Sequence, residues 1–186
     1  MIEFMIGDIT EQDTEAIVNT ANSRLAGGGG VDGAIHRRGG PEIMTDLKAK
    51  YKSCPTGSAV LSTGGKLKTK FVIHAVGPIY TSDSDDARLL ASAYRTSLEL
   101  CSKHQIKSVA FPSISTGAYR YPVKEAASVA VQTVSDYLKG HPEIKLTRFV
   151  LFDESTYQIY RDIYVNFCHS EEKPKNPDRD PSLRSG

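Results

Sequence analysis

The sequence has few of the features that mark several protein classes. Its three cysteines, Cys54, Cys101 and Cys168, are widely spaced and form no Cys-x-x-Cys pair. This excludes a disulfide scaffold or a zinc ribbon and is typical of a reducing cytoplasm. No apolar run approaches the roughly 18 residues of a membrane span, and the first residues do not resemble a secretion signal. We therefore expect a cytoplasmic protein with no membrane partner.

An excess of charge of one sign is also lacking. Lysine and arginine number 23 against 22 aspartates and glutamates, which gives a net charge of +1. A protein that holds duplex nucleic acid through many phosphate contacts needs a basic surface, so nucleic acid is disfavoured as a partner. The 186 residues match the usual size of one domain with its own core. We expect this domain to be a monomer.

Short apolar runs alternate with helical patterns along the chain. The runs are continuous, as in strands that are covered on both faces, and they lie at 2–6, 16–18, 58–62, 71–76, 108–111 and 148–152. Apolar residues recur at helical spacing over 90–101, 123–137 and 157–167, with Pro122 as a first-turn proline and Asp153 as a cap. This alternation predicts an α/β fold of three layers, in which ligands bind where loops leave the carboxyl ends of strands.

The last segment, 170–186, differs from the rest of the chain. It contains three prolines and eight charged residues, and Leu183 is its only large apolar residue. Such a segment buries too little apolar surface to offset the entropy cost of ordering. We predict a domain over 1–169 followed by a flexible polar tail over 170–186.

The loop after the second apolar run contains four consecutive glycines at 27–30, and a helix is predicted to begin at about Val31. Glycine lets backbone N–H groups approach a ligand, and a helix N-terminus favours an anion, so phosphate is the expected ligand. Gly28, Gly30 and Gly33 match G-x-G-x-x-G. However, the first glycine lies too far beyond the strand, and no acidic residue follows about 20 residues on, so a dinucleotide-binding Rossmann motif is rejected.

Asp32 and His36 lie four residues apart, on one face of this predicted helix. The helix dipole favours a carboxylate in the first turn, so Asp32 could serve either helix stability or chemistry. For His36, packing or hydrogen bonding is favoured over a role as general base. A similar choice applies to Asp8, which follows the first run. It could accept a hydrogen bond from a ligand, or serve as a turn residue or helix cap.

A second loop of this kind, 112–122, follows the fifth run and carries Ser115, Thr116 and Gly117. Two loops that present N–H groups at helix starts predict two bound phosphates or one diphosphate. A serine nucleophile is a weaker alternative, because no Gly-x-Ser-x-Gly elbow occurs.

Several segments together resemble the macrodomain family, which binds ADP-ribose, and in particular its MacroD-type members. The segments run in family order: 7–10, 16–22, 27–36, 54–57, 74–78, 111–117 and 150–153. The resemblance implies a mixed, roughly six-stranded sheet between helices. It also implies that Asp8 binds the adenine amino group, with the Ile9 N–H beside it, and that Phe152 packs on the adenine face.

The resemblance further implies that Asn22 and Asp32 are the catalytic pair at the distal ribose. The residues implied at the diphosphate and distal ribose are Gly30, Val31, Asp32, Ser115, Thr116, Gly117, Ala118 and Tyr119. MacroD-type members hydrolyse the ester that joins ADP-ribose to protein Asp or Glu, and they deacetylate O-acetyl-ADP-ribose. The implied partners are therefore ADP-ribose, O-acetyl-ADP-ribose and mono-ADP-ribosylated proteins, without cofactor or metal. A non-catalytic reader of ADP-ribose is the main alternative, and single-stranded nucleic-acid binding is a weaker one.

Two positions depart from the family pattern. Arg38 stands where the family often has alanine, and we expect it only to add a solvated charge. Arg120 stands where glycine is usual, beside the predicted phosphate loop. Its side chain could point to solvent or attract the diphosphate, and its backbone could be strained if the position is left-handed.

Overall fold

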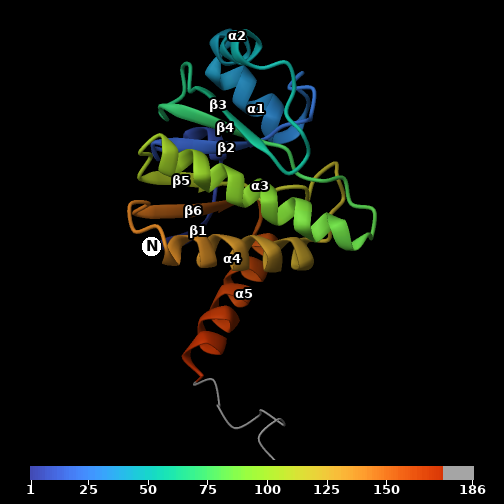
Figure 1. Cartoon of the computed structure of the whole chain (residues 1–186), viewed down its shortest axis with the longest axis vertical. Helices are drawn as coiled ribbons and strands as arrows, with labels where there is room; N and C mark the ends of the chain where they lie inside the picture. The colour runs from blue at the N-terminus through green and yellow to red at the C-terminus, as the bar shows by residue number, and fades with distance from the viewer. Residues whose placement is uncertain (174–186) are drawn as a thin grey trace, which may run out of the picture.

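The computed structural model describes residues 1–173, and its centre is one mixed sheet of six strands (Figure 1). The strands follow the order β1-β6-β5-β2-β4-β3, and all neighbours are parallel except β3 and β4. Their bounds are Ile2–Ile6 (β1), Ala16–Thr20 (β2), Ala59–Thr63 (β3), Phe71–Ala75 (β4), Ser108–Phe111 (β5) and Leu146–Leu151 (β6). The predicted mixed sheet is confirmed.

Helices cover both faces of the sheet, which confirms the predicted three layers (Figure 1). One apolar core lies between the sheet and α3, α4 and α5, and a second lies between the sheet and α1 and α2. The bounds are Ile9–Glu11 (η1, a 3-10 turn), Gly30–Gly39 (α1), Pro41–Lys50 (α2), Ser84–Lys103 (α3), Val123–Lys139 (α4) and Glu154–Glu172 (α5).

Four aromatic side chains form a cluster in the apolar core between the sheet and α3, α4 and α5. Phe111 and Phe149 lie on neighbouring strands with ring centroids 6.0 Å apart, and Tyr94 and Tyr160 pack on them from α3 and α5. All four side chains are fully buried. Burial of one such side chain stabilises the fold by about 1.5–3 kcal/mol, so this cluster fastens α3 and α5 to the sheet.

Several boundaries differ slightly from the prediction. β2 continues to Thr20, because Asn19 pairs in register with His74 even though both are polar. Pro122 is the N-cap of α4 rather than a first-turn residue, whereas Asp153 caps α5 by accepting from the Thr156 N–H, as predicted. α5 ends at Glu172, so the first residues of the predicted tail are helical; residues 174–186 lie outside the described residues. Among residues 1–173, no helix has the length and apolarity that a membrane crossing requires.

Five strands of the sheet are parallel, and the carboxyl ends of four of them, β1, β6, β5 and β2, meet at one edge, which we call the crest. Asp8 follows β1, Phe152 follows β6, residues 115–119 follow β5, and the glycine-rich loop follows β2. Neighbouring strands lie about 4.8 Å apart, so these segments form a row of roughly 14 Å. The fold therefore brings together the predicted loops in a line.

Candidate functional site

The glycine-rich loop ends at the N-terminus of α1, as the sequence predicts. Its N-cap, Gly29, contributes no side-chain hydrogen bond to the helix. A side chain at Gly29 or Gly30 would meet nothing within 4 Å, so this face is open. At Gly33 a Cβ would lie 2.7 Å from the Gly28 carbonyl oxygen, which is why glycine is required there. The first N–H groups of α1 can therefore reach an anion.

Asp32 lies in the first turn of this helix, and its carboxylate is almost entirely buried, with 5% of the residue exposed. Its Oδ1 accepts a hydrogen bond of 2.6 Å from the Asn19 amide and lies 3.2 Å from Nε2 of His36. A Cβ placed on Gly28 would lie 3.4 Å from Oδ2. Oδ1 is thus held by the protein, while Oδ2 faces the glycine-rich loop.

The pKa of Asp32 lies below its ordinary value of 3.8. Burial alone would raise this pKa, but the hydrogen bonds from His36 and Asn19 outweigh burial and favour the ionised form. The direction agrees with the effect expected from the helix N-terminus, and the hydrogen bonds are its main physical cause. Asp32 is consequently ionised at neutral pH and is a weak base.

Asn19 connects Asp32 to a buried histidine. Its Nδ2 lies 3.0 Å from Nδ1 of His74, whose Nε2 lies 2.7 Å from the Ser62 hydroxyl. Asn19 and His74 are fully buried, and burial lowers the pKa of His74 to about 3. His74 is therefore neutral, and a chain of polar groups runs from Asp32 into the sheet.

The predicted catalytic Asn22 binds its own loop. Its Nδ2 donates to the Gly27 carbonyl at 2.9 Å, and its Oδ1 accepts from the Ala26 N–H at 3.2 Å. Asn22 therefore contacts Gly27, and Asp32 lies beside the next residue, Gly28. The second hydrogen on Nδ2 is donated to no acceptor among residues 1–173.

The loop over 115–119 is shaped by close packing against Gly77. Ser115 has a left-handed backbone, with φ of 67°, and a Cβ on Gly77 would collide with its hydroxyl. The Ser115 hydroxyl is buried, and the Thr116 hydroxyl donates to the Ser113 carbonyl at 3.1 Å. Within the described residues, the N–H groups of 115–119 donate to no protein acceptor. These backbone groups, rather than the hydroxyls, are the donors that the loop offers to an anion.

Asp8 and Phe152 lie side by side, because Gly7 donates to the Leu151 carbonyl at 3.0 Å. Phe152 is 93% exposed, so its ring is accessible from solvent. Asp8 caps η1, since its Oδ1 accepts from the Thr10 N–H and hydroxyl. The cap interpretation is thus confirmed for Oδ1, and the Asp8 side chain as a whole is 42% exposed. Hydrogen bonding from Thr10 also holds the pKa of Asp8 below its ordinary value.

Arg38 is more than a solvated charge. Its guanidinium lies 3.1 Å from Glu11 and 3.7 Å from Oδ2 of Asp8. It therefore links α1 to η1 and to Asp8, the carboxylate that is predicted to bind the adenine amino group. The sequence-based expectation for this residue was wrong, because the end of α1 lies against η1 in the fold. Arg120 is exposed and has a φ of 59°, so its backbone is left-handed.

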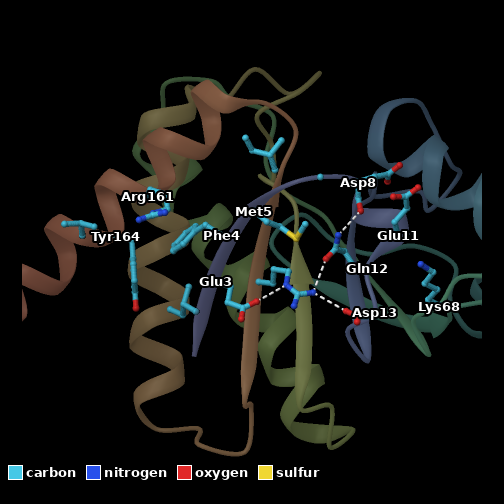
Figure 2. Close-up of a pocket in the computed structure, with 15 residues that line it drawn as sticks. Glu3, Phe4, Met5, Asp8, Glu11, Gln12, Asp13, Lys68, Arg161 and Tyr164 are labelled. Carbon is cyan, nitrogen blue, oxygen red and sulfur yellow. Dashed lines mark hydrogen bonds and ion pairs between the residues drawn. The ribbon is translucent and has the colours of Figure 1, made fainter.

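Asp8 also lines an open groove along β1, which has a volume of about 990 Å³ (Figure 2). Arg148 crosses this groove and binds Glu3, Gln12 and Asp13. A smaller hollow of about 330 Å³ lies beside the glycine-rich loop and is bordered by His36 and Arg37. In the part of the chain that the structure describes, no group of three or more His, Cys, Asp or Glu side chains could hold a metal ion.

Sequence reasoning did not single out Asn19, His74 or Ser62. Two of them carried a signal, since Asn19 and His74 are polar residues within otherwise apolar strands. A buried polar side chain needs a partner, so such an exception predicts a buried hydrogen-bond network. The partners themselves follow from the register of β2, β4 and β3, which the sequence does not contain.

Comparison with known proteins agrees with this geometry. The Macro domain family profile matches residues 18–130. A macro domain-containing protein of Caldanaerobacter subterraneus is 53% identical over 88% of this chain and 95% of its own length. A protein of Cronobacter turicensis named O-acetyl-ADP-ribose deacetylase is 49% identical over 86% of this chain and 93% of its own length.

Solved structures that are similar to this chain are also macrodomains. The macrodomain of Oceanobacillus iheyensis with ADP is 41% identical, with a TM-score of 0.83 over 91% of this chain and 92% of that one. The macrodomain of Trypanosoma brucei in complex with ADP-ribose is 36% identical, with a TM-score of 0.80 over 87% of this chain and 68% of that one.

Proposed function

Because the chain belongs to the macrodomain family, we propose that it binds ADP-ribose along the crest and hydrolyses esters of ADP-ribose. The substrates are O-acetyl-ADP-ribose and proteins that carry mono-ADP-ribose on Asp or Glu, as for MacroD-type members. The name O-acetyl-ADP-ribose deacetylase, carried by relatives at 49% and 44% identity, supports this activity.

The order of the crest segments supports the mode of binding. Asp8 and Phe152 lie at one end, the N–H groups of 115–119 lie between, and the glycine-rich loop with Asp32 lies at the other end. This order matches a ligand with a base at one end, a diphosphate in the middle and a ribose at the other end. The free N–H groups of both loops suit the diphosphate.

The single observation that carries the hydrolase proposal is the carboxylate of Asp32. It is buried and ionised, and Oδ1 is occupied by protein donors while Oδ2 faces the glycine-rich loop. Oδ2 can accept a hydrogen bond from a water molecule and orient it toward the ester. A lowered pKa makes Asp32 a poor proton acceptor, so water positioning is favoured over full proton abstraction. Hydrolysis then adds this water across the ester and releases ADP-ribose and a carboxylic acid.

Chromatography of O-acetyl-ADP-ribose incubated with the protein tests the proposal. Conversion to ADP-ribose and acetate is expected with the natural protein and not with Asp32→Ala, although Asp32→Ala should still bind ADP-ribose in calorimetry. Binding without turnover by the natural protein would make it a reader and would overturn the hydrolase proposal.

A further inference from the structure

The chain of polar groups that starts at Asp32 and passes through Asn19 ends in His74 of β4 and Ser62 of β3. We propose that His74 and Ser62 are positioning residues for the Asp32 carboxylate and that they act through Asn19. The expected effect on catalysis rests on the proposed function, because it presupposes that the protein hydrolyses ADP-ribosyl esters. The geometry that carries the inference, however, is independent of the substrate.

The two hydrogens on Nδ2 of Asn19 are both in use. One is donated to Oδ1 of Asp32 at 2.6 Å, and the other points to Nδ1 of His74 at 3.0 Å. Because the amide nitrogen is a donor only, Nδ1 of His74 must be a bare acceptor. The Asn19–Asp32 bond therefore coexists with only one tautomer of neutral His74.

Ser62 selects this tautomer. Its single hydroxyl hydrogen is donated to the Thr63 carbonyl at 2.9 Å. The Ser62 oxygen, 2.7 Å from Nε2 of His74, must then accept, which places the ring proton on Nε2 and leaves Nδ1 bare. Burial lowers the pKa of His74 to about 3, so the doubly protonated ring does not compete near neutral pH.

Apart from Asp32 and His74, no side chain among residues 1–173 holds the Asn19 amide in this orientation. Its Oδ1 is buried and accepts no hydrogen bond from residues 1–173. A proton on Nδ1 of His74 would repel the amide hydrogens and favour an amide flip. The flip would place the amide oxygen against the ionised Asp32, where two acceptors would repel each other. The tautomer of His74 thus favours or opposes the hydrogen bond that Asn19 donates to Asp32.

Two variants of His74 separate positioning from packing. His74→Asn keeps an acceptor oxygen near the place of Nδ1, whereas His74→Leu keeps more of the apolar volume and removes the acceptor. We expect His74→Leu to lower kcat for ester hydrolysis by about 10- to 100-fold, as loss of a partner that orients a metal ligand does in metalloenzymes, with ADP-ribose affinity nearly unchanged. His74→Asn should recover much of the loss in kcat.

A purely structural role predicts the opposite order. Leucine suits an apolar core better than a small amide does, so His74→Leu should then be the more stable and the more active variant. Thermal unfolding of both variants is measured alongside kcat and KM. If kcat follows thermal stability, or if neither variant changes kcat, the positioning role is overturned.

A measurement on the natural protein keeps the inference testable even if the variants fail to fold or the protein has no esterase activity. Nitrogen-15 NMR of the His74 ring should show a bare Nδ1 and a protonated Nε2. The reverse pattern would overturn the proposal directly. Where His74→Leu folds, carbon-13 NMR of the Asp32 carboxyl should show a pKa raised relative to the natural protein, because the Asn19 bond is weakened. Failure of the proposed function alone would abolish turnover in the natural protein and leave both spectra as expected.

Discussion

Arg120→Gly is expected to stabilise the protein because of its backbone. Arg120 has a φ of 59°, in the left-handed region that side chains rarely adopt, and its N–H donates to the Gly117 carbonyl at 3.0 Å. The side chain is exposed, and it forms no ion pair with residues 1–173. Replacement by glycine therefore removes strain and costs little packing.

The size of the effect follows from two opposing contributions. A left-handed conformation costs an ordinary residue roughly 1–2 kcal/mol relative to glycine. Glycine also lowers the free energy of unfolding by about 0.5–1 kcal/mol, because it increases the conformational entropy of the unfolded chain. The centres of these two ranges leave a net gain of about 0.75 kcal/mol, which corresponds to an increase in Tm of about 1.5–3 °C for a domain of this length.

Calorimetric unfolding measures this difference, and Gln105→Gly is the matched control. Gln105 is exposed and has a φ of 58°, but it lies before β5, at the end of the sheet opposite the crest. Both variants should raise Tm by similar amounts. An unchanged or lower Tm for Arg120→Gly beside a raised Tm for Gln105→Gly would refute the strain argument at Arg120.

The same pair of variants tests whether Arg120 attracts the diphosphate. If it does, added salt should weaken ADP-ribose binding more in the natural protein than in Arg120→Gly, because exposed charge pairs are screened. Gln105→Gly should behave as the natural protein does. Parallel salt titrations with identical slopes for all three proteins would leave Arg120 without an electrostatic role.

Three further predictions concern the crest. Asp8→Ala should weaken ADP-ribose binding by about 1–3 kcal/mol, the loss of a hydrogen bond to a charged group, and unchanged affinity in calorimetry would remove Asp8 from the adenine site. Because the folded-state pKa of Asp32 lies below 3.8, kcat should persist above that value and decline only as the pH falls through the lowered pKa; a decline centred nearer neutrality in a pH–rate profile would contradict this. Gly77→Ala should lower Tm, since its Cβ would collide with the Ser115 hydroxyl, and urea unfolding without loss of stability would show that the loop can shift.

Much of the fold could be predicted from local patterns in the sequence. Continuous apolar runs predicted the six strands, and the cap at Asp153 predicted the start of α5, because both depend on residues close together in the chain. The exact ends could not be predicted. β2 extends through the polar Asn19 because its partner in β4 is His74, a contact between residues 55 positions apart.

Parts of the candidate site could likewise be predicted from local motifs, whereas other parts depend on contacts between distant segments. The glycine-rich loop and the 115–119 loop are visible as motifs, and the structure places both at the crest. The contact of Arg38 with Asp8 and the burial of the Ser115 hydroxyl against Gly77 depend on how distant segments pack, so neither could be predicted from spacing. Asn22 stays a predicted catalytic residue, although the structure shows its side chain bound to its own loop.

The central claim is that this macrodomain cleaves ADP-ribosyl esters, and the most direct measurement uses a protein mono-ADP-ribosylated on Glu. The natural protein, Asp32→Ala and a blank without enzyme are incubated with this substrate, and free ADP-ribose is measured over time. We expect steady release by the natural protein and strongly reduced release by Asp32→Ala. Release by the natural protein no faster than in the blank would contradict the claim.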